Sequence, residues 1–399
     1  MSEFLPYGKQ SIEQGDIDAV VEALQSDFLT CGPRVEEFEK QFAEFIGAKH
    51  AVVMANATVA LHIAMEIAKI SPGDRVITTP NTFLSSANCA AFVGATPDFC
   101  DIDPVTYNLD AKALEANWKD DTKAVVAVAY AGQSCNMPEI ARIARERNAI
   151  VIEDACHGTG GGFSHEGKSY RLGGHPWADM TTFSFHPVKT LTTGEGGILV
   201  TDKDDYATQA RLMRAHGVVR DPAQFKGLGT DDPVMEEKGP WFYEMQSLGY
   251  NGRITDFQCA LGMAQLKKLP RFIERRREVV STYNAAFSEI PWLSTPGLLR
   301  DDDREEISWH LYTVRIDFNA IGKTRSEVMA ELREQGIGTQ VLYIPVHLQP
   351  WYRETYGYTL GKCPEAESYY RDCLSLPLYP AMTTTDVERV ISGIKNLVS

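Results

Sequence analysis

The chain has 399 residues, of which 44% are hydrophobic and 23% charged, and its formal net charge is −15. This length is too great for one small core and predicts two domains. The acidic balance disfavours bulk attraction to nucleic acid or an anionic membrane, and no 18-residue apolar run or cleavable leader pattern is seen. We therefore expect a cytoplasmic globular protein without nucleic-acid or membrane partners, which binds any anionic substrate in a local basic pocket.

The eight cysteines are scattered along the chain. They include no CxxC pair, and no histidine stands at a metal-ligand spacing from them. We expect reduced thiols and no metal site.

Short apolar segments alternate with helical patterns from about residue 50 to 200. The predicted strands are HAVVMA (50–55), RVITT (75–79), TPDFCDI (96–102), AVVAVAY (124–130), AIVIEDA (149–155), TTFSF (181–185) and GILVT (197–201). A helix is predicted over 138–148, with Pro138 near its start. This alternation indicates an α/β fold with a mostly parallel sheet.

A long helical stretch over 256–288 leads to a second domain, and Pro270 is expected to kink or split it. Beyond it, predicted strands YTVRIDF (312–318) and TQVLYI (339–344) mix with helices over 324–335 and 384–397. We expect a large domain with an N-terminal arm over 1–260, then a bridging helix and a smaller α+β domain over 261–399.

Lys189 lies on the connection between two predicted strands, beside Gly194, Gly196 and Gly197. A lysine at a strand end is commonly a solvated charge. If it is desolvated, however, it loses its proton more easily and can form a Schiff base with an aldehyde. The local residues leave both interpretations open.

Asp154 ends a predicted buried strand, where ligands bind in α/β sheets. A carboxylate there either caps the next turn or pairs with a protonated ring nitrogen, which keeps that ring an electron acceptor. The following GTGGGF (158–163) would be a dinucleotide fingerprint only if it opened a helix, and Phe163 stands where the last glycine belongs.

Two further loops follow predicted strands. The residues Asn56, Ala57 and Thr58 open a predicted helix and suit a phosphate, although a plain helix cap gives the same pattern. Phe83, in the polar segment TTPNTFLSSAN (78–88), is either a core residue or a ring stacked on a flat cofactor.

Together, Thr58, Phe83, Asp154 and Lys189 are the parts needed to hold pyridoxal 5′-phosphate. The chain resembles, nearly end to end, the sugar aminotransferases of the DegT/DnrJ/EryC1/StrS family, which have fold type I. The resemblance is carried by the segments FLTCGPRVEEFEKQFAEFIGAKHAVVMANATVALHIA, TTPNTFLSSANCA, VAYAGQ, IEDACHGTGG, FSFHPVKTLTTGEGGILVT, RAHG, LGYNGRITDFQCALGMAQLKKL and GIGTQVLYIPVH.

This resemblance implies pyridoxal 5′-phosphate as the cofactor and a role for each matching residue. Lys189 would be the Schiff-base lysine, Asp154 the partner of the ring nitrogen and Phe83 the stacking ring. The remaining implied cofactor contacts are Ala57, Thr58 and Ser184 at the phosphate, His157 near O3′, and Asn251 at the phosphate of a neighbouring subunit. A homodimer with shared sites would follow. Many relatives have glycine where this chain has Ala57.

The resemblance also implies residues that contact the substrate. Tyr7, Thr30 and Tyr343 are such implied contacts. His186, three residues before Lys189, either orients the sugar or the lysine or is a packed or surface histidine. An acidic chain needs local donors for an anionic substrate, and Arg253 and His310 are candidates. Arg220, Lys226 and His347 are further candidates for a nucleotide diphosphate. The polar loop over about 219–245 is either a lid over a bulky ligand or a mobile insertion.

Within the family, NATVAL, YAGQ and SFHPVK most resemble members that aminate the C4 ketone of a UDP-linked 4-keto-6-deoxy-N-acetyl-L-altrosamine. L-glutamate would be the amino donor and 2-oxoglutarate its product. Sister enzymes for bacillosamine, perosamine or 3-amino sugars share most of these residues, so the sugar stays open. A sugar dehydratase would carry histidine in place of Lys189, and a regulatory homologue would be expected to lose Lys189 or Asp154.

Overall fold

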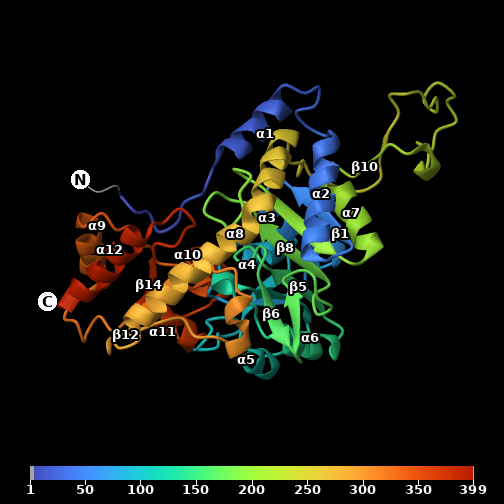
Figure 1. The fold of residues 1–399 in the computed structure, drawn as a ribbon. Coiled ribbons are helices and arrows are strands. Elements are labelled where there is room, and N and C mark those ends of the chain that lie inside the picture. The colour runs from blue at the N-terminus through green and yellow to red at the C-terminus, as the bar shows by residue number, and fades with distance from the viewer. Residues whose placement is uncertain (1–3, 399) are drawn as a thin grey trace.

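The computed structural model describes residues 4–398 and contains a large and a small sheet joined by one long helix (Figure 1). The large sheet has the strand order β1–β9–β8–β5–β4–β2–β3. Its strands are β1 (His50–Met54), β2 (Arg75–Thr78), β3 (Thr96–Phe99), β4 (Thr122–Val128), β5 (Ile150–Asp154), β8 (Met180–Ser184) and β9 (Gly197–Thr201). Only β9 runs antiparallel to its neighbours. The predicted mostly parallel α/β sheet and its seven strands are confirmed.

Helices cover both faces of this sheet, as the nearly continuous apolar strands require. One face carries α2 (Pro33–Ile46), α5 (Ala111–Ala116), α6 (Met137–Arg145) and the first half of α8 (Asp256–Phe287). The other carries α3 (Ala57–Ile67), α4 (Ser85–Phe92) and α7 (Asp204–Arg214). The ends of α2 follow its sequence: Pro33 is its first residue, and Gly47 adopts φ 85° directly after its last.

The 32-residue helix α8 joins the two sheets (Figure 1). Its first half packs into the large core through Leu266 and Leu269, and its second half packs into the small core through Tyr283 and Phe287. Of the two predicted outcomes at Pro270, a kink or a split, the split does not occur, because the helix continues through the proline. Burial of residues on both sides of Pro270 outweighs the backbone hydrogen bond that proline removes. The proposed domain boundary near residue 260 falls within α8.

The small sheet is antiparallel, with β13 (Tyr312–Ile316) between β12 (Leu293–Ser294) and β14 (Cys373–Leu376). The predicted helices are present as α9 (Arg325–Glu334) and α12 (Thr384–Lys395), and α10 (Pro350–Tyr356) and α11 (Pro364–Asp372) lie between them in the chain. The predicted strand over 339–344 was wrong. Only Gln340 pairs, with Ser375, before the chain crosses to the large domain, where the Val346 N–H donates to the Pro80 carbonyl (3.0 Å).

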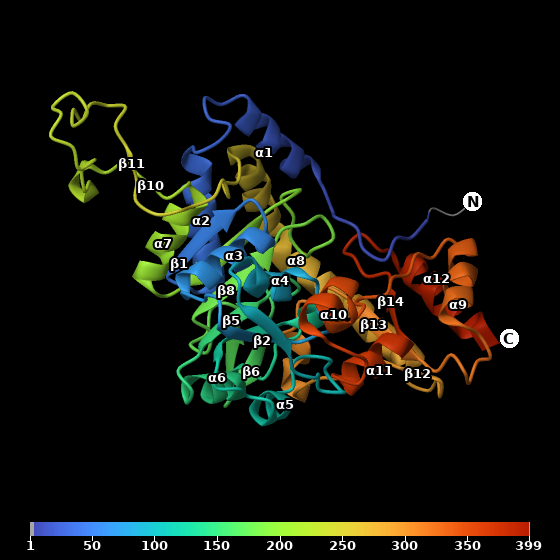
Figure 2. The same cartoon turned by 180° about the vertical axis from the view of Figure 1, so that it is seen from behind.

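Two peripheral segments complete the fold. The N-terminal segment pairs Leu5 with Ile337 of the small domain, and α1 (Gln14–Leu24) packs against α8. The short pair β10 (Val218–Val219) and β11 (Glu244–Met245) starts a projecting loop, residues 218–245, which extends away from the body in both views (Figures 1 and 2). Of the helices in residues 4–398, none combines the length and apolar character needed to cross a membrane.

Gly197, the first residue of β9, lies directly against the start of α3. A Cβ atom at Gly197 would stand 2.4 Å from the amide nitrogen of Ala57 and 2.4 Å from the carbonyl carbon of Asn56. Such distances are far below van der Waals contact. The glycine therefore allows a strand to approach the turn that opens α3.

We predict that Gly197→Ala lowers the free energy of unfolding of the cofactor-free protein by about 1–3 kcal/mol, because the added methyl group must displace this backbone. Gly15→Ala is the matched control. Gly15 lies in α1 with no atom within 4 Å of the added Cβ, so its replacement should leave stability unchanged or slightly higher. Urea denaturation of both variants measures this difference, and equal stabilities would contradict the close approach.

Candidate active site

A cavity of about 670 Å³ lies where β4, β5 and β8 end. It brings together residues that are widely separated in the chain. Of the residues predicted from the sequence, those that line it are Tyr7, Ala57, Thr58, Phe83, Asp154, His157, Ser184, His186, Lys189 and Tyr343. Cavities at the carboxyl ends of parallel strands are the usual binding sites of α/β folds.

Lys189 follows β8 on a turn in which its N–H donates to the His186 carbonyl (2.9 Å). The residue is half-buried and faces the cavity. Burial lowers the pKa of the Lys189 amine, and the nearby Cys156 and Asp154 offset part of this effect. The amine is thus more easily deprotonated than that of a surface lysine, which makes it a better nucleophile.

Asp154, the last residue of β5, is buried beside Lys189 with both carboxylate oxygens engaged. Its Oδ2 accepts a hydrogen bond from the Ser86 hydroxyl (2.6 Å), and its Oδ1 accepts one from the Cys156 N–H (3.1 Å). This carboxylate is therefore fixed in position at the cavity wall.

The turn before α3 lies at another side of the cavity. Asn56 caps the helix by accepting a hydrogen bond from the Val59 N–H (2.9 Å), while Ala57 and Thr58 form its first turn. The first N–H groups of a helix have no acceptor within it and carry the positive end of the helix dipole. Together with the Thr58 hydroxyl, they suit a phosphate group.

His157 is held between two partners. Its Nδ1 accepts a hydrogen bond from the Ala131 N–H (3.2 Å), and its Nε2 lies 3.1 Å from the Tyr343 hydroxyl. Burial, followed by the charge of Lys189, holds the pKa of His157 well below its usual range. The ring is therefore neutral at physiological pH. Because Nδ1 is an acceptor, the proton is on Nε2 and is donated to Tyr343.

Aromatic rings line the cavity near His157. Tyr343 stacks on His157 with ring centroids 6.0 Å apart and an interplanar angle of 28°. The ring centroid of Phe83 lies 6.2 Å from that of Tyr343. Phe83 is 56% exposed although it is a large apolar side chain. A free apolar face in a cavity suits a flat ring ligand.

Four of the predicted site residues do not line the cavity of a single chain. His310 is buried behind His157, with ring centroids 4.5 Å apart. Thr30 pairs with Thr255 at the surface, and Arg253 is half-buried. Asn251 is exposed, on a turn whose Gly252 carbonyl accepts the Ala55 N–H (2.8 Å) just before the start of α3.

The further candidates for a diphosphate also lie outside this cavity. His347 is buried, with its Nε2 2.9 Å from Glu367. Arg220 and Lys226 belong to the projecting loop, and no residue of that loop lines the cavity. The loop therefore does not cover the cavity of its own chain.

Sequence reasoning missed Ser86, Cys156 and Glu195, which also line the cavity. Each lies within a segment that carries the family resemblance, yet none has a local pattern that points to a ligand. Ser86, for example, acquires its significance from contact with Asp154, 68 residues further along the chain.

The structure confirms the rejection of GTGGGF as a dinucleotide fingerprint. No helix follows these glycines; Gly162 instead begins the hairpin strand β6 (Gly162–His165), which pairs with β7 (Lys168–Arg171). Gly161 packs closely against Ser308, where a Cβ would lie 2.8 Å from the hydroxyl oxygen. All eight cysteines are free thiols, and the described residues contain no cluster of side chains suited to a metal ion.

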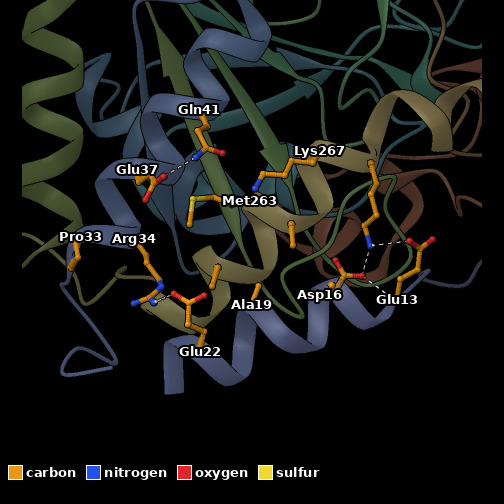
Figure 3. A pocket seen from close by; sticks show the side chains of 14 residues that line it. Glu13, Asp16, Ala19, Glu22, Pro33, Arg34, Glu37, Gln41, Met263 and Lys267 are labelled. Carbon is orange, nitrogen blue, oxygen red and sulfur yellow. Dashed lines mark hydrogen bonds and ion pairs between the residues drawn. The ribbon is translucent and has the colours of Figure 1, made fainter. Parts of the chain in front are cut away.

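A second cavity, of about 650 Å³, lies between α1, α2 and α8 (Figure 3). Its charged side chains largely neutralise one another, with Lys268 paired to Asp16 and Arg34 paired to Glu22. None of the predicted site residues lies in it. The predicted site residues lie instead in or near the first cavity, where β4, β5 and β8 end.

The side chains that line the cavity at the ends of β4, β5 and β8 fit pyridoxal 5′-phosphate. A lysine amine of lowered pKa, a fixed carboxylate, a helix start and an open aromatic face match its aldehyde, ring nitrogen, phosphate and ring. The fold and this site define a pyridoxal-phosphate-dependent enzyme of fold type I.

Comparison with known proteins agrees with this class. The model of the DegT/DnrJ/EryC1/StrS aminotransferase family matches residues 10–395, and the chain belongs to that family. It is 42% identical over 398 residues to the spore coat polysaccharide biosynthesis protein SpsC of Bacillus subtilis, covering 100% of this chain and 98% of that protein.

Solved structures show the same fold. Helicobacter pylori PseC, described as an aminotransferase involved in the biosynthesis of pseudoaminic acid, superposes with a TM-score of 0.87 at 28% identity over 99% of both chains. A putative sugar aminotransferase of Streptococcus pneumoniae in its PMP form gives a TM-score of 0.87 at 25% identity, again over 99% of both chains.

The lowered pKa of Lys189 predicts a pH-dependent stability of the cofactor-free protein. The charged amine destabilises the fold below its lowered pKa. This destabilisation decreases as pH rises from there towards the ordinary value of 10.5, and it is absent above that value. Cofactor-free Lys189→Met should therefore be more stable than wild type near pH 7, and the difference should shrink as the pH approaches 10.5.

Urea denaturation at several pH values measures this difference. Lys267→Met, at an exposed position on α8, is the control and should show no comparable gain at neutral pH. A gain for Lys189→Met that is independent of pH would contradict the desolvation argument.

Proposed function

We propose that this enzyme transfers the amino group of L-glutamate to the C4 ketone of a nucleotide-linked 4-keto-6-deoxy sugar. The product would be a 4-amino-4,6-dideoxy sugar nucleotide, together with 2-oxoglutarate. The observation that carries the proposal is the Lys189 amine, of lowered pKa, in one cavity with the fixed carboxylate of Asp154.

Bound pyridoxal 5′-phosphate would supply an aldehyde that exchanges amino groups and a ring that withdraws electrons. Lys189 would hold its aldehyde carbon and Asp154 would pair with its ring nitrogen. Ala57, Thr58 and Ser184 would bind the phosphate, while Phe83 and His157 would contact the ring. All of these residues line the same cavity.

The Lys189 amine would also move the protons of both half-reactions. It would take the proton from the Cα atom of glutamate in the first half-reaction and return a proton to C4 of the sugar in the second. His186, exposed at the cavity, would orient the sugar or the lysine. A sugar dehydratase or a regulatory homologue is disfavoured because the chain retains both Lys189 and Asp154.

For the sugar, we propose UDP-4-keto-6-deoxy-N-acetyl-L-altrosamine, which would yield UDP-4-amino-4,6-dideoxy-N-acetyl-β-L-altrosamine. The similarity to PseC supports this choice, and the similarity to a spore coat polysaccharide protein supports an amino sugar destined for a surface polymer. A bacillosamine, perosamine or 3-amino sugar precursor is the alternative.

We further propose that the working unit is a homodimer with shared sites. Within one chain the basic residues that line the cavity are Lys189, His186 and the neutral His157, and no arginine is among them. A nucleotide diphosphate needs more positive charge than these provide. Arg253 and the exposed Asn251 lie on the surface beside the start of α3, where a second chain could use them.

The projecting loop supports the same arrangement. It extends away from its own body (Figure 2) and exposes large apolar side chains, among them Val234 (76%) and Trp241 (63%). Apolar surface of this kind favours contact with another protein. We propose that the loop, with Arg220 and Lys226, reaches the site of the partner chain, and that Tyr7 and Tyr343 contribute to sugar binding from this chain. Thr30, at the surface, would contribute only to the site of the partner chain, and His310, buried behind His157, would act only through that ring.

The activity is tested by incubating the purified enzyme with L-glutamate and a panel of nucleotide-linked 4-keto sugars. Turnover is expected with the UDP-linked altrosamine precursor and not with the sugar freed of its nucleotide. Lys189→Ala should lose at least about 10²–10⁴-fold of the rate, because one amine serves cofactor exchange and proton transfer. Borohydride reduction of the wild type should attach the cofactor to Lys189, and attachment to another lysine would refute the assignment.

Mixing inactive variants tests the shared site. Lys189→Ala and Asn251→Ala should each be inactive alone. If Asn251 acts across the dimer, a mixture in which subunits exchange should regain activity, because each mixed dimer contains one intact site. With random pairing about half of the dimers are mixed, so up to about a quarter of all sites should be active. Exchange demonstrated by mass spectrometry without any return of activity would contradict the shared-site proposal.

A further inference from the structure

Two consecutive serines at the start of α4 contact opposite parts of the active site. The Ser85 hydroxyl lies 2.7 Å from the Thr58 hydroxyl, beside the start of α3. The Ser86 hydroxyl lies 2.6 Å from Oδ2 of Asp154. The first turn of one helix thus contacts both the phosphate end and the ring-nitrogen end of the proposed cofactor site.

The hydrogen bonds at Ser86 have a defined direction. An ionised carboxylate has no proton to give, so Ser86 donates to Asp154. Because the Ser86 proton is committed to this bond, the Ser86 oxygen accepts from the Thr82 hydroxyl, which lies 2.7 Å away. Thr82 and Ser86 are 3% and 1% exposed, so water does not compete readily for either bond.

This chain of hydroxyl groups complements the bond from the Cys156 N–H to the other carboxylate oxygen (3.1 Å). One oxygen of Asp154 is held from α4 and the other from the turn after β5. Rotation of the carboxylate about its terminal torsion would break both bonds. The terminal torsion of an aspartate is otherwise broadly free, so these two bonds restrict the Asp154 carboxylate to one orientation.

We infer that Ser86 is a positioning residue of this enzyme. Supported by Thr82, it holds the Asp154 carboxylate in the orientation that a protonated ring nitrogen in the cavity requires. The inference rests on the role proposed for Asp154 and adds a function for two residues that the sequence did not single out. In metal sites, removal of a partner that orients a ligand commonly costs about 10–100-fold in affinity or activity, and an effect of that order is expected for Ser86.

The test compares Ser86→Ala, Ser86→Thr, Ser85→Ala and Asp154→Asn in the full-length enzyme. Three properties are measured: the affinity of the cofactor-free protein for pyridoxal 5′-phosphate, the pH midpoint of the visible absorption change of the cofactor-bound protein, and the melting temperature of the cofactor-free protein. The second property reports on the ring environment and would not respond to a purely structural role.

Ser86→Ala should weaken cofactor affinity by about tenfold or more and shift the pH midpoint in the same direction as Asp154→Asn. Ser86→Thr, which retains a hydroxyl group, should restore the midpoint. Ser85→Ala removes the hydroxyl next to Thr58 and should leave the midpoint near that of wild type. Similar melting temperatures for the two alanine variants would exclude a general loss of α4.

A wild-type midpoint and affinity for Ser86→Ala, with both altered in Asp154→Asn, would overturn the inference while the role of Asp154 stood. Wild-type behaviour of Asp154→Asn would instead remove the role of Asp154 itself. If Ser86→Ala does not fold, Thr82→Val breaks the same chain one bond further away. It should shift the midpoint in the same direction, and no shift in that variant would overturn the inference.

Discussion

The proposed active site depends on the removal of one amine, that of Lys189, from water. The turn that follows β8 holds Lys189 in the protein, and the cavity at the strand ends leaves its amine accessible to a ligand. Desolvation lowers its pKa, which favours the neutral, nucleophilic form. Cys156 and Asp154 favour the charged form of Lys189 and thus offset part of this lowering of its pKa.

The walls around this amine come from elements that are held together by close packing. Gly197 lets β9 touch the turn that opens α3, which brings a helix start to the cavity beside the lysine. The segment that carries Tyr343 leaves the small sheet after Gln340 and reaches the large domain at Val346. Through its contact with His157, Tyr343 connects the small domain to the site, so the relative position of the two domains affects the shape of the cavity.

The charge distribution supports the proposal that the site is shared between two chains. A chain of net charge −15 offers no general attraction to a diphosphate, and the cavity itself contains few cationic groups. Local donors are therefore required. The exposed turn at Asn251 and Arg253 and the apolar projecting loop are surface features that acquire a function in the proposed homodimer. Both lie on the large domain, where the site also lies.

The sequence by itself determined the α/β class, the seven strands of the large sheet, both C-terminal helices and the residues of the central site. Strands and helix caps follow from local sequence. Asp154 ends a strand, Lys189 follows one and Thr58 lies at a helix start, and the topology of a parallel sheet brings such positions to one edge. The resemblance to a family added their roles.

Only the tertiary structure decided the continuity of α8 through Pro270, the departure of residues 341–345 from the small sheet, and the burial of His310 behind His157. Each outcome depends on packing between distant segments, which outweighs local preference. The Ser86–Asp154 hydrogen bond joins residues 68 positions apart. No periodicity or motif encodes such a contact, because it exists only once the fold brings the start of α4 to the end of β5.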